Sequence, residues 1–411
     1  MRPWQLIALI FVLGLLAVFN GWKPFWVLFY ALLVAFALSL VWLALSVRGL
    51  KFVRSSVGGR AEVGDRIEER LALENHSWIP KLWVQVSDGS TLPGHHAGYV
   101  SSVGPRQRIA WRARTLCRKR GRYTLGPVTA TTGDPMGLFR REITLAPSSQ
   151  LLVLPNVFDL RAFPLFPGVM PGRGRGSQRS LQVTTNVVTV RDYRPGDALT
   201  RIHWPSTARH GQLMVKEFDL DPTIDVMILL DLDQGAHAGE DESSTEEYAV
   251  TIAASISAYL LRQRELTVTL EAPGPSGVSL PADRGERQLD RSLEALAIVR
   301  ADRHHPLSTA LAELEMRLSR NTALIVITPS VDLDWEQRLG YLRRRGVRPA
   351  VVLLDPSTFD DHHGGVSRVI DALDGAGVPS VTVRLGDALA RVLESSASGG
   401  RTTRGRLAIA R

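Results

Sequence analysis

Two long apolar runs at the N-terminus constrain this chain more than any other feature of its sequence. The first covers residues 4–19 with Gln5 as its polar exception, and the second covers residues 25–47. About 20 apolar residues in a helix are enough to cross the hydrocarbon core of a bilayer. Turn-forming residues and a charge separate the runs at 20–24. The pattern predicts a transmembrane hairpin within residues 1–50, with helices over about 4–20 and 25–47.

Positively charged residues orient this hairpin. Arg2 precedes the first run, Arg48, Lys51 and Arg54 follow the second, and Lys23 alone lies in the connecting turn. The positive-inside rule then places both ends in the cytoplasm. We expect a multi-pass protein of the bacterial inner membrane with the bulk of the chain cytoplasmic. The alternative is a cleaved signal peptide, and it is disfavoured because no small-x-small pattern precedes the second run.

Charge and cysteine content narrow the chemistry of the remaining chain. The formal net charge of +8 comes mostly from arginine. Such an excess suits a cytoplasmic membrane face or a polyanion, although a genome rich in GC gives the same bias. Cys117 is the single cysteine among the 411 residues, which excludes an intramolecular disulfide and a cysteine-based metal site.

In residues 51–150 the apolar residues recur with a period of two. Alternation of apolar and polar residues marks 66–75, 81–87, 106–113 and 121–126 as strands. Several short strands with glycine- and proline-rich turns between them predict a small β-sandwich.

A basic run, residues 106–122, lies within this region. Arg108, Arg112 and Arg114 share parity, so they line one strand face. That face suits an anionic lipid surface, or it is a solvated face that discourages edge pairing. Aromatic residues for base stacking are sparse, so we expect no nucleic acid as a partner.

The densest motif spans residues 190–218 and mixes charged, aromatic and turn-forming residues. A catalytic interpretation of His203 requires a nucleophile beside it and an orienting acid, and the spacing of Ser206 and Asp197 enforces no triad. We therefore assign no catalytic residue and expect structural or partner-binding use. The residues assigned to this motif are Arg191, Asp192, Tyr193, Gly196, Asp197, His203, Trp204, Arg209, Lys216 and Glu217.

The motif resembles the signature of the bacterial DUF58 family of unknown function. The family pattern runs Arg-Glu-Tyr, Gly-Asp, Ile-x-Trp, Ala-Arg-x-Gly and Lys-Glu, and Asp192 replaces its usual glutamate. The Gly-Asp-Pro-Met-Gly-Leu-Phe turn at 133–139 also matches members of the family. The resemblance implies a von Willebrand factor A-like domain. It also implies partnership with a MoxR-type AAA+ ATPase and, in many cases, with a transglutaminase-like membrane protein.

The C-terminal part alternates buried strands and helices. Continuous apolar runs at 223–231 and 323–327 are typical of buried parallel strands, and 246–264 and 334–345 are predicted helices. The alternation predicts a doubly wound α/β sheet, whose ligands bind at the carboxyl ends of the strands. Asp231 stands at such an end.

The resemblance also implies a divalent-ion site at this position. The family of A domains has Asp-x-Ser-x-Ser where this chain has Asp231, Asp233 and Gly235, and Pro329 stands where a second acid is common. Asp231 and Asp233 supply hard oxygen ligands of the kind that suit Mg²⁺. The alternative is that Asp231 caps the next segment or pairs with an arginine.

These patterns predict a membrane-anchored, protein-binding adaptor rather than an enzyme. No Gly-x4-Gly-Lys-Ser/Thr motif occurs, so ATP chemistry is expected from a partner. The alternatives are a metal-dependent hydrolase that uses Asp231, Asp233 and His203, or a basic lipid- or nucleic-acid-binding protein. The expected divisions are 1–50 (membrane hairpin), 51–150 (β-sandwich), 151–222 (connecting segment with the motif), 223–397 (von Willebrand factor A-like domain) and 398–411 (disordered tail).

Overall fold

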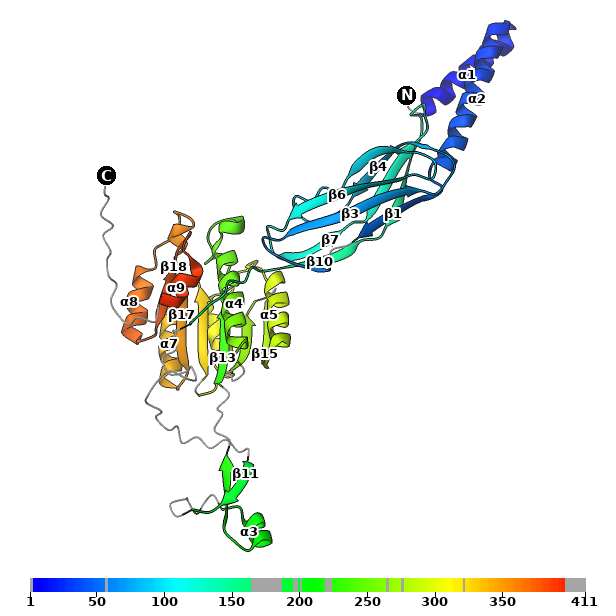
Figure 1. Cartoon of the computed structure of the whole chain (residues 1–411). Coiled ribbons are helices and arrows are strands. Elements are labelled where there is room, and N and C mark those ends of the chain that lie inside the picture. Colours follow the sequence, from blue (N-terminus) through cyan, green and yellow to red (C-terminus); the bar gives the residue numbers. More distant parts are fainter. Residues whose placement is uncertain are drawn as a thin grey trace, which may run out of the picture. The chain divides into compact units, whose positions relative to one another are not determined.

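A computed structural model describes residues 3–55, 58–163, 187–194, 199, 202–218, 224–263, 266–274, 277–320 and 322–395 (Figure 1). The chain divides into two compact units, 1–156 with 296–298 and 157–295 with 299–411. The expected disordered tail, 398–411, lies outside the described residues, as do Gly196 and Asp197 of the motif.

Two apolar helices open the first unit, α1 (Pro3–Asn20) and α2 (Lys23–Ser46). Pro24 lies in the first turn of α2, where its missing N–H costs nothing. Gly14 of α1 faces the ring of Phe29 of α2, so the helices pack against each other. Among the described residues α2 alone is long and apolar enough to cross a membrane, with a mean hydropathy of 2.5, and α1 is shorter. An apolar helix near the N-terminus is thus confirmed, and a double crossing stays a prediction.

A mostly β region follows, as expected. Its described strands form a three-stranded sheet β1-β3-β6, a three-stranded sheet β2-β10-β7 and a four-stranded sheet β5-β4-β8-β9. Val84, Val86 and Val103 form a core with Leu73, because alternate residues of each strand point inward. The strands are β1 (Leu50–Ser55), β2 (Arg60–Glu62), β3 (Arg66–Asn75), β4 (Lys81–Asp88), β5 (Tyr99–Val103), β6 (Arg108–Leu116), β7 (Gly121–Leu125), β8 (Val128–Gly133), β9 (Arg140–Ala146) and β10 (Ser149–Leu154).

Three arginines of the basic run lie on the exposed face of β6. Arg108 lies 3.4 Å from Glu74, and Arg112 and Arg114 lie 3.1 and 3.3 Å from Glu68. These acids stand on the neighbouring strand β3. Part of the positive charge of this face is therefore neutralised within the sheet.

The motif segment forms a small structure of its own. Strands β11 (Val187–Asp192) and β12 (Met214–Phe218) pair antiparallel, and α3 (Trp204–His210) lies between them in the chain. Gly211 ends α3 in the left-handed conformation, with φ of 70°, which glycine adopts without steric cost.

The remaining described residues form an α/β region around a six-stranded mixed sheet. Its order is β15-β14-β13-β16-β17-β18, and all neighbours are parallel except β15, which runs antiparallel to β14 (Figure 1). No strand was expected from the sequence at the position of β15. The strands are β13 (Ile224–Leu230), β14 (Leu266–Ala272), β15 (Val278–Asp283), β16 (Ala323–Thr328), β17 (Arg348–Leu354) and β18 (Ser380–Val383), and the helices are α4 (Thr245–Leu261), α5 (Glu286–Ile298), α6 (Leu307–Leu314), α7 (Asp334–Arg344), α8 (Ser367–Ala376) and α9 (Leu389–Ser395).

Both faces of this sheet are covered. Leu229 and Val326 pack with Trp335 of α7 and with apolar residues of α6 and α8. Ile228 and Ile325 have the opposite parity and are also fully buried. Burial on both faces explains why these strands are continuous apolar runs in the sequence.

Candidate functional site

The strand order of the sheet reverses between β13 and β16. Asp231 directly follows β13, and Thr328 is the last residue of β16. The N–H of Asp231 donates to the carbonyl of Ile327 at 2.9 Å, which holds the two strand ends together. Ligands of open α/β sheets bind outside the carboxyl ends of the strands at such a reversal. The residues around Asp231 therefore form the candidate site.

Asp231 is buried, and internal donors bind both of its carboxylate oxygens. The Thr328 hydroxyl donates to Oδ2 at 2.6 Å, and the N–H of Asp233 donates to Oδ1 at 3.0 Å. Burial raises the pKa of Asp231, and this effect outweighs the opposing effects of nearby His237 and of the two hydrogen bonds. Protonation of this carboxyl is therefore easier than in water.

Asp233 pairs with a histidine that the sequence analysis did not single out. Its Oδ1 lies 2.6 Å from Nδ1 of His304 and accepts the backbone N–H groups of His305 at 3.0 Å and Gly235 at 3.4 Å. The Asp233 side chain is 8% exposed and the His304 side chain is 74% exposed. The pair connects a buried carboxylate to the surface.

His237 was also missed, and it supports the loop after β13. Its Nε2 lies 3.0 Å from the carbonyl of Asp231, and its Nδ1 lies 3.0 Å from the hydroxyl of Thr245. The same hydroxyl accepts the N–H of Ala238 at 2.9 Å. Adjacent histidines at 304 and 305, shortly before α6, were the available signal for this side of the site.

These donors bear on the expected Mg²⁺ site. The described ranges contain no group of three or more His, Cys, Asp or Glu side chains placed to hold a metal ion. A divalent ion at Asp231 and Asp233 has to displace hydrogen bonds from Thr328 and His304. The donor set fits a hydrogen-bonded site better than an ion site, and Mg²⁺ binding stays a prediction.

Hydrogen bonds between backbone groups hold the motif residues in place. The N–H of Tyr193 donates to the carbonyl of Leu213 at 2.9 Å, and the N–H of His203 donates to that of Met214 at 2.8 Å. Nδ1 of His203 lies 2.7 Å from the hydroxyl of Ser206, inside the same segment.

Oδ1 of Asp192 accepts a hydrogen bond from the Gln212 amide at 3.1 Å. Trp204 is 66% exposed, and Arg209 is exposed at the end of α3, which leaves both available to a partner. Lys216 and Glu217 lie on β12.

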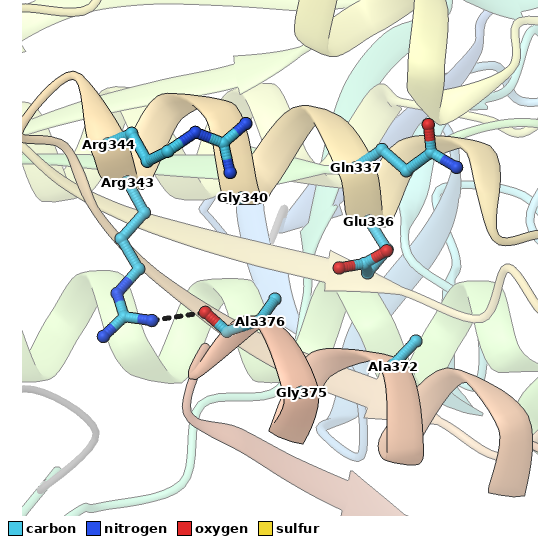
Figure 2. A pocket seen from close by; sticks show the side chains of 8 residues that line it. All are labelled: Glu336, Gln337, Gly340, Arg343, Arg344, Ala372, Gly375 and Ala376. Atoms are coloured by element: carbon cyan, nitrogen blue, oxygen red, sulfur yellow. Dashed lines mark hydrogen bonds between the residues drawn. The ribbon is translucent and has the colours of Figure 1, made fainter.

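A separate cavity of about 800 Å³ lies between α7 and α8 (Figure 2). Arg343 points across it and donates to the carbonyl of Ala376. None of the site residues around Asp231 lines this cavity, so it is not part of the candidate site. Its lining residues are Glu336, Gln337, Gly340, Arg343, Arg344, Ala372, Gly375 and Ala376.

One family model matches the motif and the α/β region together. Residues 189–388 match the family model described as "Protein of unknown function DUF58". This match supports membership of the DUF58 family. The "Uncharacterized protein YeaD" of Bacillus subtilis (strain 168) supports it too, at 25% identity over 344 residues, covering 80% of this chain and 84% of that protein. The DUF58 match includes Asp231, Asp233 and His304.

Solved structures give only weak likenesses. The CARDB domain of a Pyrococcus furiosus protein has a TM-score of 0.20 and 13% identity, covering 26% of this chain and 87% of that chain. The beta-glucosidase of Listeria innocua has a TM-score of 0.18 and 12% identity, covering 25% of this chain and 16% of that chain. Scores this low carry no argument about fold or function.

Proposed function

We propose that this DUF58 protein is a membrane-anchored, protein-binding adaptor that acts with a MoxR-type AAA+ ATPase in complex assembly or cell-envelope maintenance. The Asp233–His304 pair at the reversal of strand order carries the proposal. It offers a charged, hydrogen-bonding surface where open α/β sheets bind their ligands. The mixed sheet with its antiparallel edge strand β15 supports a von Willebrand factor A-like domain.

The other parts of the proposal rest on the anchor and on the family resemblance. The exposed apolar surface of α2 supports a membrane anchor, and the positive-inside rule puts the bulk of the chain in the cytoplasm. The MoxR-type ATPase supplies the ATP chemistry, and a transglutaminase-like membrane protein is the second proposed partner. The exposed motif residues, Trp204 above all, are a second contact for such a partner.

Binding between purified proteins tests the proposal. The full chain in lipid nanodiscs is immobilised, and the MoxR-type ATPase of the same organism is added with and without ATP and Mg²⁺. The site variant is Asp233→Asn with His304→Gln, and the matched control is Asp290→Asn on the exposed face of α5. We expect the site variant to lose about tenfold in affinity, which is about 1.4 kcal/mol, and the control to bind like the natural chain.

Two outcomes contradict parts of the proposal. If the site variant binds the ATPase with the same affinity as the natural chain, the interface does not include Asp233. The Trp204→Ala variant then tests the motif. No binding in any condition contradicts an adaptor role with this ATPase. Calorimetric titration of Mg²⁺ into the full chain alone tests the ion separately, since the ATPase itself uses Mg²⁺.

A further inference from the structure

The turn between β8 and β9 satisfies several of its own backbone N–H groups. The buried carboxylate of Asp134 accepts the N–H of Met136 at 3.0 Å and the N–H of Phe139 at 2.6 Å. The N–H of Gly137 donates to the carbonyl of Asp134 at 3.1 Å. Pro135 has no N–H to satisfy. Internal hydrogen bonds of this kind are what a segment needs before it enters an apolar medium.

The outside of the same turn is apolar. Met136 is 60% exposed at its tip, Pro135 is exposed, and Leu138 and Phe139 are half-buried. Arg140 and Arg141 follow directly and are also exposed. An apolar tip followed by basic residues is the composition of a segment that inserts into an anionic lipid surface.

The turn touches the apolar helix α2 along its length and not at its end. The rings of Phe139 and Phe36 meet edge to face, with centroids 5.5 Å apart. Roughly 15 Å of helix separates Phe36 from the last residue of α2. Leu33 and Leu38, near Phe36 in the helix, are 44% and 63% exposed. Lipid that surrounds this part of α2 therefore also reaches the turn.

The junction between α2 and the β region holds this geometry. Nζ of the buried Lys81 donates to the carbonyl of Leu45 at 2.8 Å, which satisfies one of the free carbonyls at the end of α2. The N–H of His76 donates to the carbonyl of Gly49 at 2.8 Å. These bonds tie β4 and the loop after β3 to the end of the helix and to the residues that follow it.

A second aromatic anchor lies at the same junction. Trp78 is 71% exposed, and the guanidinium of Arg106 stacks 3.8 Å from the centre of its ring. Its neighbour Ser77 packs against Gly49, directly after α2. Exposed tryptophan and arginine together are typical of the headgroup layer of a membrane.

From these contacts we propose that the turn at residues 134–139 is a membrane-inserted wedge. Met136 and Phe139 contact the lipid of an anionic bilayer beside α2. The β region is thereby held against the membrane at two points, the helix junction and the turn. This inference rests on the membrane anchor of the proposed function, and it adds a lipid-binding site that the helices alone do not supply.

Quenching by lipid-borne nitroxides tests the wedge. The full chain carries Cys117→Ala, so that each variant has one cysteine for an environment-sensitive fluorophore. Met136→Cys labels the turn, Leu33→Cys labels α2, and Met316→Cys is the matched control, because Met316 is 93% exposed in the other unit. The proteins are reconstituted into phosphatidylcholine–phosphatidylglycerol vesicles with a nitroxide near the top of the acyl chain.

We expect labels at 136 and 33 to be quenched several-fold more than the label at 316, and to resist water-soluble iodide. Quenching at 33 with none at 136 overturns the wedge and leaves the membrane anchor intact. No quenching at either position overturns the anchor itself. In a second measurement on the unlabelled chain, Met136→Glu is expected to raise the accessibility of the 134–139 amides to hydrogen exchange in vesicles, and Met316→Glu is expected to leave it unchanged.

Discussion

The hydroxyl of Thr328 donates to Oδ2 of Asp231 across 2.6 Å and so joins the ends of β13 and β16 where the strand order of the sheet reverses. Both side chains are buried. A buried carboxylate that keeps its hydrogen bonds costs far less free energy than one that loses a donor. This bond therefore supports the candidate site and the middle of the sheet together.

Removal of the Thr328 hydroxyl tests this role. Thr328→Val keeps the shape of the side chain but leaves Oδ2 of Asp231 without its donor. We expect a loss of about 1–3 kcal/mol in the stability of the α/β region. Hydrogen exchange of the β13 and β16 amides, followed by mass spectrometry, measures it. Thr328→Ser retains the hydroxyl and serves as the control, and equal exchange in the two variants contradicts the role of the bond.

Neighbouring acids on β3 test which face of this strand is buried. Glu69 is buried and binds Arg54 through two hydrogen bonds, of 3.0 and 2.8 Å. Glu68 is exposed and lies 3.1 Å from Arg112. Glu69→Gln is expected to destabilise the β region by about 1.5–3 kcal/mol, because Arg54 loses charge-assisted hydrogen bonds to Glu69 and keeps Asp88 at 3.4 Å. Glu68→Gln is expected to cost less than about 1 kcal/mol, and to lose this effect at high salt. Urea denaturation at low and high salt compares them, and similar costs contradict the assigned faces.

Asp88, in the same buried cluster, is expected to make the stability of the β region sensitive to acid. Burial alone raises the pKa of Asp88, but hydrogen bonds with His95 and Ser90 and the charge of Arg54 outweigh it, so the pKa lies below its ordinary value of 3.8. An acid whose pKa is lower in the folded state stabilises that state above the unfolded pKa. This stabilisation is lost as the pH falls from about 3.8 through the lower folded pKa.

The pH dependence of unfolding measures this effect. The midpoint temperature of unfolding of the natural chain, followed through β-region fluorescence, is expected to fall as the pH drops below 3.8. Asp88→Asn is expected to flatten this slope. An unchanged slope in the variant means that other groups cause the acid sensitivity.

Cys117 is expected to be unreactive in the folded chain. It is fully buried, and burial together with the charge of Asp65 raises the pKa of its thiol to about 11. The reactive thiolate is therefore scarce at pH 8, and reagents do not reach it. Maleimide labelling should proceed only after unfolding, whereas a cysteine introduced at Met136 should react in detergent without it. Rapid labelling of the folded natural chain contradicts this packing.

Hydrophobic periodicity predicted much of the architecture. The period of two in residues 66–75 corresponds to β3, and the apolar runs at 223–231 and 323–327 correspond to β13 and β16. These patterns are local, because burial of one or both faces dictates the type of each residue along the strand. The strand β15 was missed, because its exposed edge position imposes no such pattern and Pro281 lies within it.

The candidate site could be predicted only in part. Asp231 and Asp233 follow a recognisable buried strand, so their position at a strand end could be inferred from the sequence. His237 carries no local signal of its contacts, and the adjacent histidines at 304 and 305 do not show that His304 meets Asp233 from a loop far along the chain. Periodicity reports which side of an element is buried, but it does not report which loops meet at the end of a sheet.

The sequence by itself determined the apolar helix near the N-terminus, the β-rich middle and the alternating α/β region, because burial constrains residue types within each element. The tertiary structure alone decided that Asp233 pairs with His304 and that Phe139 of the turn packs against Phe36 of α2. Such contacts join residues from separate elements, and they form only when backbone pairing has brought those elements together. The pairing at the sheet end and the turn beside α2, which carry the two proposals, are both of this kind.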